Sequence, residues 1–271
     1  MLRDRFRAIS VLALLSASAL WAQGDFKWPA GKRVAVSFSF DDARLSQVDT
    51  GLPLFDTNGV KATFYVSLRN AEKRLDGWKR AIAHGHEIGG HSLSHACTAN
   101  YHLSSTVALE DFNLTTMARD LDQANAGIKR LLGVTPVTFA YPCGQKFVGR
   151  GLAARSYIPL VAERYLAGRG YLDEAPNDPK VCDLAQSMGT GGDDLTAAEM
   201  LALVERAAKR GGWLILVGHE VGKKGYQVTD VASLEAVFRY AKDPANGVWI
   251  DTVESVARYV AKTRAASTAQ R

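Results

Sequence analysis

Residues 33–42 read Arg-Val-Ala-Val-Ser-Phe-Ser-Phe-Asp-Asp, and this stretch decides the fold class. Valine and phenylalanine alternate with alanine and serine over residues 33–40, which is the period of two of a β-strand. The strand ends in Asp41 and Asp42, adjacent carboxylates that repel each other unless a positive charge lies nearby. A divalent cation would relieve that repulsion, whereas a helix N-cap or a turn is the alternative use of aspartate here. The alternation also sends the two side chains in different directions, so they can have different roles.

The elements expected after this strand alternate between strands and helices to the end of the chain. Strands are expected at 60–66, 87–90, 136–141, 165–168, 184–188, 213–217 and 248–251. Helices are expected at 71–84, 114–132, 196–209 and 231–242, and from 253 onward. The glycine-rich run 189–192 is expected to be a plain turn. This alternation indicates parallel strands with crossover helices, in either a barrel or an open sheet.

The first 22 residues are typical of a secretory signal peptide. Three arginines open the chain, an apolar run follows over 8–21, and cleavage is expected after Ala22 or at 17–19. An uncleaved membrane anchor is the alternative, although the run is short for a membrane span. The expected organisation is a signal peptide at 1–22, one domain at 23–264 and a flexible tail at 265–271. A secreted or periplasmic protein with no membrane span after cleavage is therefore expected.

The composition bounds the size of the core and the class of partner. The chain is 47% hydrophobic, which is enough for one sizeable core, and a monomer is expected. Its net charge is +5, and the part after residue 22 carries 30 − 27 = +3, because residues 1–22 hold three arginines and one aspartate. Since this charge is mild and forms no dense basic patch in the sequence, nucleic acid is not expected as a partner.

The chain has three cysteines, Cys97, Cys143 and Cys182. In an oxidising compartment they allow one disulfide and leave one thiol, and the sequence alone does not choose the pair. For Cys143, half of a disulfide or a small hydrophobic residue is favoured over a nucleophile, because no partner histidine can be assigned to it.

Polar residues gather where the expected strands end. Besides the two aspartates, they are His91 and His95, then Pro142-Cys143-Gly144, then His219. In parallel α/β folds the carboxyl ends of the strands form the active-site face. Four strands are therefore expected to deliver polar groups to one rim.

His91 and His95 are the strongest candidates for metal ligands. Histidines at i and i+4 lie on one face of a helical turn and can share a metal, although two surface or core histidines are the alternative. Together with one aspartate they give two nitrogens and one oxygen. Such a set leaves open positions for water and substrate, which suits catalysis rather than a structural site.

Taken in order, these stretches resemble the motifs of the polysaccharide deacetylases with a NodB homology domain, carbohydrate esterase family four. The resemblance runs from about Arg33 to Val260. The matching stretches are Ser39-Phe40-Asp41-Asp42, Gly85-His86-Glu87-Ile88-Gly89, His91-Ser92-Leu93-Ser94-His95, Ala140-Tyr141-Pro142-Cys143-Gly144 and Leu214-Ile215-Leu216-Val217-Gly218-His219. Each is weak alone, and their common order makes the signal strong. The resemblance implies a distorted (β/α)7 barrel.

The resemblance also implies a metal-dependent hydrolase that removes acetyl groups from a polysaccharide or oligosaccharide. Asp42, His91 and His95 would hold a divalent metal, Zn²⁺ in the first place and Co²⁺ or another ion otherwise. Asp41 would be the general base that activates water, and His219 would be the general acid that protonates the leaving nitrogen or oxygen.

The third motif of the family departs most from its usual form. The backbone N–H of Cys143 would help to bind the oxyanion, with Tyr141, Pro142 and Gly144 beside it at the substrate. However, Cys143 replaces the usual tyrosine or phenylalanine. Ala140 stands where the family carries an arginine that pairs with the base, so Asp41 is left without its usual partner.

The fourth motif of the family, an Asp-Trp-like element, cannot be located. Asp173, Asp178 and Asp183 lie in the right stretch, but no tryptophan follows any of them. These departures keep other functions open: a carbohydrate-binding protein that has lost turnover, a hydrolase of a small cyclic amide, and an iron-dependent oxygenase with the same ligand set. The pairing of Asp41 with His219 favours hydrolysis, since binding alone needs no acid and base.

Overall fold

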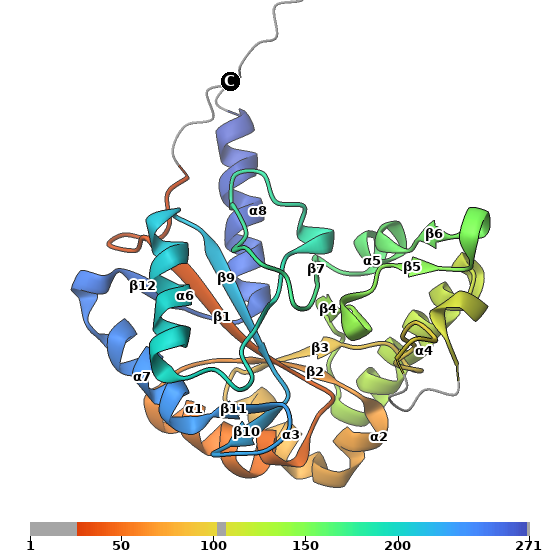
Figure 1. Ribbon diagram of the computed structural model, residues 1–271, viewed down its shortest axis with the longest axis horizontal. Helices are drawn as coiled ribbons and strands as arrows, with labels where there is room; N and C mark the ends of the chain where they lie inside the picture. The colour runs from red at the N-terminus through yellow and green to blue at the C-terminus, as the bar shows by residue number, and fades with distance from the viewer. Residues whose placement is uncertain (1–25, 102–106, 270–271) are drawn as a thin grey trace, which may run out of the picture.

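The structure is a computed structural model that describes residues 26–101 and 107–269, and its centre is an eight-stranded parallel sheet (Figure 1). The strands follow the order β7-β4-β3-β2-β1-β9-β8, and β12 pairs with the start of β1. They are β1 Val34–Asp41, β2 Thr63–Val66, β3 Glu87–Gly90, β4 Thr138–Ala140, β7 Ala167–Arg169, β8 Thr190–Gly191, β9 Trp213–Gly218 and β12 Val248–Ile250. Two small ribbons accompany the sheet: β5 Phe147–Val148 with β6 Arg155–Ser156, and β10 Glu220–Gly222 with β11 Val228–Asp230. The signal peptide expected at 1–22 lies outside the described residues.

The segment from Ser187 to Gly191 joins the two ends of the sheet. The backbone of Ser187 donates to Gly168 O (2.7 Å) and accepts from Gly170 N (2.8 Å), while β8 pairs with β9. The expected distorted (β/α)7 barrel is therefore confirmed. The plain turn expected at 189–192 is wrong, because this run supplies β8. The strand expected at 184–188 is also wrong, because 184–186 form a 3₁₀ turn.

Glycine is required where this segment passes the interior of the barrel. A Cβ on Gly189 would lie 2.4 Å from Gly170 O and 2.5 Å from Cδ of Arg169. Such contacts are far shorter than van der Waals distances, so only glycine lets the two backbones approach this closely.

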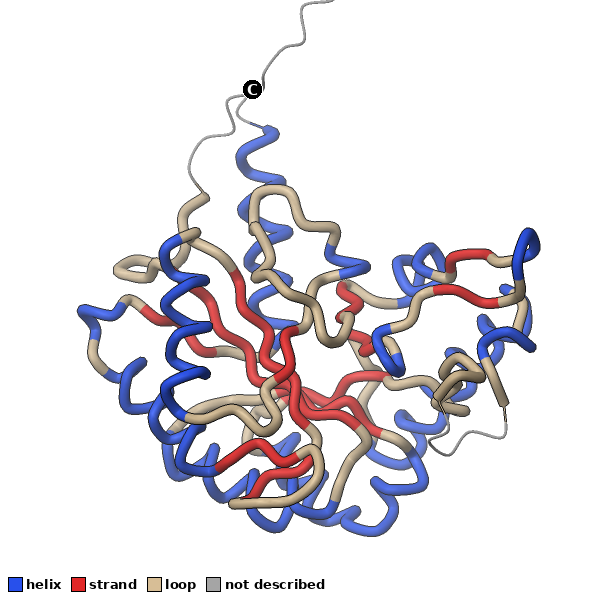
Figure 2. Tube along the Cα trace, viewed as in Figure 1, coloured by secondary structure: helices blue, strands red, loops and turns tan. Residues whose placement is uncertain are grey.

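Helices cover the outside of the sheet (Figure 2). They are α1 Leu52–Asn58, α2 Leu68–Ala71, α3 Leu75–Ala83, α4 Leu114–Leu132, α5 Ile158–Arg164, α6 Ala197–Lys209, α7 Val231–Lys242 and α8 Val253–Ala269, with a π-helical turn at Gln47–Gly51. The predicted 114–132 and 231–242 helices are confirmed, and α6 begins with a capping box formed by Thr196 and Glu199. The helix expected at 71–84 is instead broken by a 3₁₀ turn at Glu72–Arg74. Helix α8 continues through 265–269, which were expected to belong to the tail. No helix among the described residues is long and apolar enough to cross a membrane.

Strand β1 is held rigidly at the centre of the sheet. All eight of its residues are buried, and it pairs with β2, β9 and β12. Phe38 packs against Phe55 of α1 and Phe238 of α7, with ring centroids 5.9 and 5.4 Å apart. On the other face, the hydroxyl of Ser39 donates to Leu216 O (3.0 Å), so the polar side chains of this strand are paired. The end of β1 is thus a fixed platform for the residues that follow.

Candidate active site

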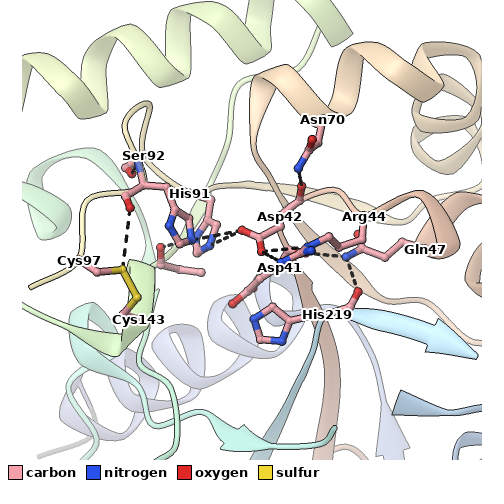
Figure 3. Close-up of polar contacts among 12 residues, drawn as sticks. Asp41, Asp42, Arg44, Gln47, Asn70, His91, Ser92, Cys97, Cys143 and His219 are labelled. Carbon is pink, nitrogen blue, oxygen red and sulfur yellow. Dashed lines mark hydrogen bonds and ion pairs between the residues drawn. A yellow bond between two sulfur atoms is a disulfide. The ribbon is translucent and has the colours of Figure 1, made fainter. Parts of the chain in front are cut away.

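The two adjacent aspartates at the end of β1 have different surroundings, as the alternation predicted (Figure 3). Asp41 is the last residue of the strand and is buried. Asp42 lies in the left-handed region at φ 72°, which turns the chain out of the sheet. Its backbone oxygen accepts from Asn70 Nδ2 at 2.9 Å, and its Oδ2 accepts from Arg44 Nη2 at 2.9 Å. The remaining oxygen, Oδ1, faces two histidines.

Asp42, His91 and His95 form a donor set that fits a divalent metal. Their ligand atoms all lie within 4.8 Å of one another, and Oδ1 of Asp42 is 3.6 Å from Nε2 of His91 and 3.2 Å from Nε2 of His95. Nδ1 of His91 lies 2.9 Å from Ala140 O, which fixes the tautomer with Nδ1 protonated and Nε2 free. Burial lowers the pKa of His91 to about 4, so its imidazole is neutral, the form that binds metals.

The segment 91–95 is not the helical turn that the i, i+4 spacing suggested. Ser92 and His95 both have positive φ, 60° and 50°, and the chain bends back so that the two imidazole centroids lie 4.8 Å apart. Asp120 of α4 holds this bend, because its carboxylate accepts from Leu93 N (2.7 Å) and Ser94 N (3.1 Å). The spacing predicted the meeting of the histidines correctly, but it gave no sign of Asp120.

Asp41 has a cationic partner despite the alanine at position 140. Arg169, the last residue of β7, is fully buried and donates from Nη2 to Oδ1 of Asp41. Ala140 of β4 is paired in register with Arg169 of β7. The guanidinium therefore comes from the neighbouring strand, at the same height in the sheet as Ala140. Burial by itself would raise the pKa of Asp41. The charge and hydrogen bond of Arg169, with further contributions from His91 and His219, together outweigh burial and hold that pKa below its usual value. The expectation that Asp41 lacks a partner is therefore wrong.

Arg169 is itself held on several sides. Its Nη1 donates to Gly170 O at 2.9 Å, and its guanidinium lies 4.8 Å from the centre of the Tyr65 ring. A planar guanidinium suits both contacts, since it donates in its plane and stacks through its face. The signal in the sequence was a single arginine directly after the strand expected at 165–168.

His219 follows β9 and is oriented by Asp193. Its Nδ1 lies 2.7 Å from Oδ2 of Asp193, while Oδ1 of Asp193 accepts from His219 N (3.1 Å) and from the hydroxyl of Thr229 (2.7 Å). Burial would lower the pKa of His219, but Asp193, together with the charge of Asp41, raises it above the usual value. The histidine is therefore favoured in its protonated form.

Asp193 is not among the three aspartates considered for the fourth motif. Asp173 accepts from Gly189 N (2.9 Å), Asp178 from Lys180 N (2.9 Å) and Asp183 from Ala185 N (3.0 Å). These three shape the backbone of their own stretch. The carboxylate that contacts the imidazole of His219 is instead Asp193, which follows the glycine-rich run.

Gln47 ties the two strand ends together. It is fully buried in the π-helical turn after β1, and its amide nitrogen donates to Asp41 O (2.6 Å) and His219 O (2.7 Å). One side chain thus fixes the separation of the backbones that carry Asp41 and His219. Nothing in the sequence pattern distinguishes this glutamine from a surface residue.

Residues 29–154 match the family model described as polysaccharide deacetylase. This match assigns the N-terminal part of the described barrel, slightly under half of the chain, to the polysaccharide deacetylase family model. The matched stretch ends before Arg169, Asp193 and His219, so those residues are assigned by the geometry above and not by the family model.

Solved structures described as polysaccharide deacetylases or as a family 4 acetyl xylan esterase share the fold. A putative polysaccharide deacetylase from Mycobacterium smegmatis superposes with a TM-score of 0.63 at 17% identity, over 88% of this chain and 93% of that one. A probable polysaccharide deacetylase from Pseudomonas aeruginosa PAO1 gives 0.61 at 17% identity, over 87% and 93%. A family 4 acetyl xylan esterase from Clostridium thermocellum, solved with a cobalt ion, gives 0.55 at 21% identity, over 83% and 91%. At these identities the likeness establishes the fold alone.

Curated relatives are similar over shorter stretches. The chain is 30% identical over 147 residues to a gellan lyase of a Bacillus species, which is 53% of this chain and 5% of that protein. It is 32% identical over 95 residues to an uncharacterized protein of Bacillus subtilis, which is 34% of this chain and 26% of that protein. The chain therefore spans only a small part of the length of these relatives.

The third family motif is locked by a disulfide. Cys97 and Cys143 are bonded, with Cα atoms 5.9 Å apart, which decides the pairing that the sequence left open. Cys182 is the free cysteine and lies 3.0 Å from Nη2 of Arg264. Tyr141, expected at the substrate, is instead fully buried and donates from its hydroxyl to Ala185 O (2.6 Å), so its side chain belongs to the core.

Proposed function

We propose that this chain is a metal-dependent carbohydrate deacetylase. One observation carries the proposal: the donor set of Asp42, His91 and His95 lies beside two groups that can transfer protons. One of them is held in its deprotonated form and the other in its protonated form. Arg169 keeps Asp41 ionised, as a base must be, and Asp193 keeps His219 protonated, as an acid must be.

In the proposed reaction these two side chains move the protons. A divalent ion on Asp42, His91 and His95 would lower the pKa of a water molecule towards neutrality and polarise the acetyl carbonyl. Asp41 accepts the proton of the attacking water, and His219 donates a proton from Nε2 to the leaving nitrogen or oxygen. The backbone N–H of Cys143 donates to the developing oxyanion. Zn²⁺ is the ion we expect first, since two imidazoles and one carboxylate with open positions suit it.

An extended glycan suits the surroundings of this centre better than a small cyclic amide does. A hollow of about 370 Å³ adjoins the third motif and is lined by Thr98, Gly144, Gln145, Lys146 and Phe147, among others. Phe147 is 60% exposed, and exposed aromatic faces beside polar groups are suited to sugar rings. N-acetyl and O-acetyl substrates need the same attack by water, so both belong to the proposal.

Export is part of the proposal. The apolar N-terminal run with its arginines supports a signal peptide, and the Cys97–Cys143 disulfide supports an oxidising compartment. A sugar-binding protein without turnover is the second candidate. The alanine at position 140 favoured it, and the arginine that replaces the missing partner from β7 weakens it.

Acetate release tests the proposal directly. The protein would be stripped with a chelator, reloaded with Zn²⁺ or Co²⁺, and assayed on N-acetylglucosamine oligomers, peptidoglycan and acetylated xylan. We expect acetate release that depends on metal and is lost in Asp41→Asn and His91→Ala. The substrate from which acetate is released fastest would show whether the enzyme prefers N-acetyl or O-acetyl groups. Sugar binding without acetate release from any of the three by the loaded wild type would replace this proposal with the second candidate.

A further inference from the structure

The Cys97–Cys143 disulfide joins two loops of the proposed centre, one with a metal ligand and the other with the oxyanion donor. Cys97 follows His95, a proposed metal ligand, by two residues, and Cys143 carries the N–H proposed for the oxyanion. The two loops leave different strands, β3 and β4. Figure 3 shows the disulfide on the side of His91 that faces away from His219.

The sheet itself holds these two loops together only weakly. The register between β3 and β4 consists of the single pair Gly90 and Phe139. Beyond it, the contact of His91 Nδ1 with Ala140 O is a further tie. By contrast, β1 and β9 share six register pairs below Asp41 and His219. The separation of His95 from Cys143 therefore depends on what lies past the strand ends.

Both loops also hold backbones that relax if they are released. His95 and Cys143 are non-glycine residues with φ of 50° and 55°. Such left-handed conformations are strained in residues other than glycine and persist only where the surroundings impose them. Asp120 imposes the bend at 93–94, and the 3₁₀ turn at Pro142–Gly144 lies against Tyr171, because a Cβ on Gly144 would meet Tyr171 N and O at 2.9 Å. The disulfide is the covalent tie between these two strained segments.

We propose that this disulfide is a positioning element of the active site, and this rests on the function proposed above. It sets the distance from the His95 imidazole to the Cys143 N–H, and hence the fit of the acetyl carbonyl between metal and hydrogen-bond donor. Misplacement of a reacting group by about 1 Å can cost roughly 100-fold in rate. The oxidised protein is the competent form, and the reduced protein keeps its barrel but turns over slowly.

The chain offers a matched control for this idea. Cys182 is a third cysteine, half-buried beside Arg264 and outside the centre, so Cys182→Ser tests the loss of a thiol without the loss of the bond. The test variant is the double substitution Cys97→Ser with Cys143→Ser. Each protein would be loaded with Co²⁺, whose visible absorption reports the geometry of the ligands.

In the double variant we expect kcat to fall about 10- to 100-fold with little change in KM, the range found when groups that orient metal ligands are removed. We also expect a changed Co²⁺ spectrum and an unchanged far-ultraviolet circular dichroism spectrum. Cys182→Ser should match the wild type in all three. Wild-type kcat and Co²⁺ spectrum in the double variant would reduce the disulfide to a contribution to stability and overturn the proposal.

Chemical reduction covers the case in which the double variant does not fold. A trialkylphosphine breaks the S–S bond, each sulfur gains an electron and a proton, and the phosphine takes the oxygen of a water molecule to become its oxide. Turnover and the Co²⁺ spectrum should change in step with the release of two thiols while the circular dichroism stays constant. Loss of turnover only when the dichroism is lost would overturn the proposal. If the wild type binds Co²⁺ but releases no acetate, the proposed deacetylase function is wrong. The role of the disulfide can still be tested in that case, because the Co²⁺ spectrum reports the ligand geometry without turnover.

Discussion

The two sides of the centre are held by different kinds of interaction. On the side of His91 and His95, backbone conformations, one carboxylate from α4 and a disulfide fix two loops. On the side of Asp41 and His219, side chains at the ends of neighbouring strands are fixed by buried charges from the barrel. The first arrangement positions the two imidazoles, whereas the second also sets the protonation states of the proposed base and acid. Charge changes should therefore move pH profiles only on the second side.

The largest effect on activity and stability is expected from substitution of Arg169, on the side of Asp41 and His219. Arg169→Met would leave the Asp41 carboxylate buried without a countercharge, which typically costs about 3–5 kcal/mol of stability. Because the guanidinium holds the pKa of Asp41 down, its loss raises that pKa, so the acidic limb of kcat/KM moves to higher pH and activity at neutral pH falls roughly 10²- to 10⁴-fold. Denaturant unfolding and pH–rate profiles would measure both effects.

Arg74 is the matched control for Arg169. It pairs with Asp49 at 2.9 Å, but both side chains are more than two-fifths exposed, and solvent screens such surface pairs so that they contribute little to stability. Arg74→Met should leave the pH profile unchanged. An Arg169→Met protein with the same acidic limb as the wild type would show that the pair is structural and does not set the charge of Asp41.

A smaller effect on activity is expected from substitution of Asp193, which contacts His219. Asp193→Asn keeps an oxygen near His219 Nδ1 but removes the charge that raises the pKa of the imidazole. Since His219 must be protonated to act as an acid, a lower pKa moves the alkaline limb of kcat/KM to lower pH. We expect about a 100-fold loss on the alkaline side and a smaller loss on the acidic side. The exposed neighbour Asp194 provides the control substitution Asp194→Asn, and equal losses at all pH values would contradict the assigned role.

How much of this centre could be predicted depended on whether neighbours in space were also neighbours in sequence. Asp41, Asp42 and the two histidines stand in short motifs at strand ends, so the pattern identified them. Arg169 and Asp193 reach Asp41 and His219 only because the folded sheet brings distant strands together. Their strands gave no clear pattern in the sequence, because β7 has three residues and β8 has two, too few for a periodic signal. The long, strongly periodic helices were predicted best, because amphipathicity and caps are local properties.

Gln47 tests position separately from charge, because it is an uncharged residue that contacts the backbones of Asp41 and His219. Gln47→Met would leave the carbonyls of Asp41 and His219 without their donor, and each buried carbonyl left unpaired costs about 1–3 kcal/mol. We expect a roughly 10-fold lower kcat/KM with both limbs of the pH profile in place. The exposed Gln186, whose amide donates to Asp183, gives the control Gln186→Met. A shifted limb in Gln47→Met would mean that Gln47 sets charge as well as position.

The smallest effect expected is on stability alone, at a buried acid with no role in the proposed chemistry. Glu87, at the start of β3, accepts from the Thr63 hydroxyl (2.7 Å), the Thr138 hydroxyl and Glu254 N (2.8 Å), all neutral donors. Burial raises its pKa to about 7, above the ordinary value of 4.5. Between these two values the folded protein binds more protons than the unfolded chain, so the free energy of unfolding falls as pH rises through this window and levels off above about 7.

Glu87→Gln removes this titration and should flatten that slope. A pKa raised by about 2.5 corresponds to a term on the order of 3 kcal/mol, so the wild type should lose about that much against the variant between roughly pH 5 and pH 8. Urea unfolding followed by circular dichroism at both pH values measures the difference. Glu235→Gln serves as the control, because the Glu235 side chain is 43% exposed. Parallel slopes for wild type and Glu87→Gln would mean that the three donors keep Glu87 ionised in the fold. In that case hydrogen bonds alone would stabilise a buried carboxylate in this barrel, and Asp41 would need Arg169 less than the comparison of the two sides implies.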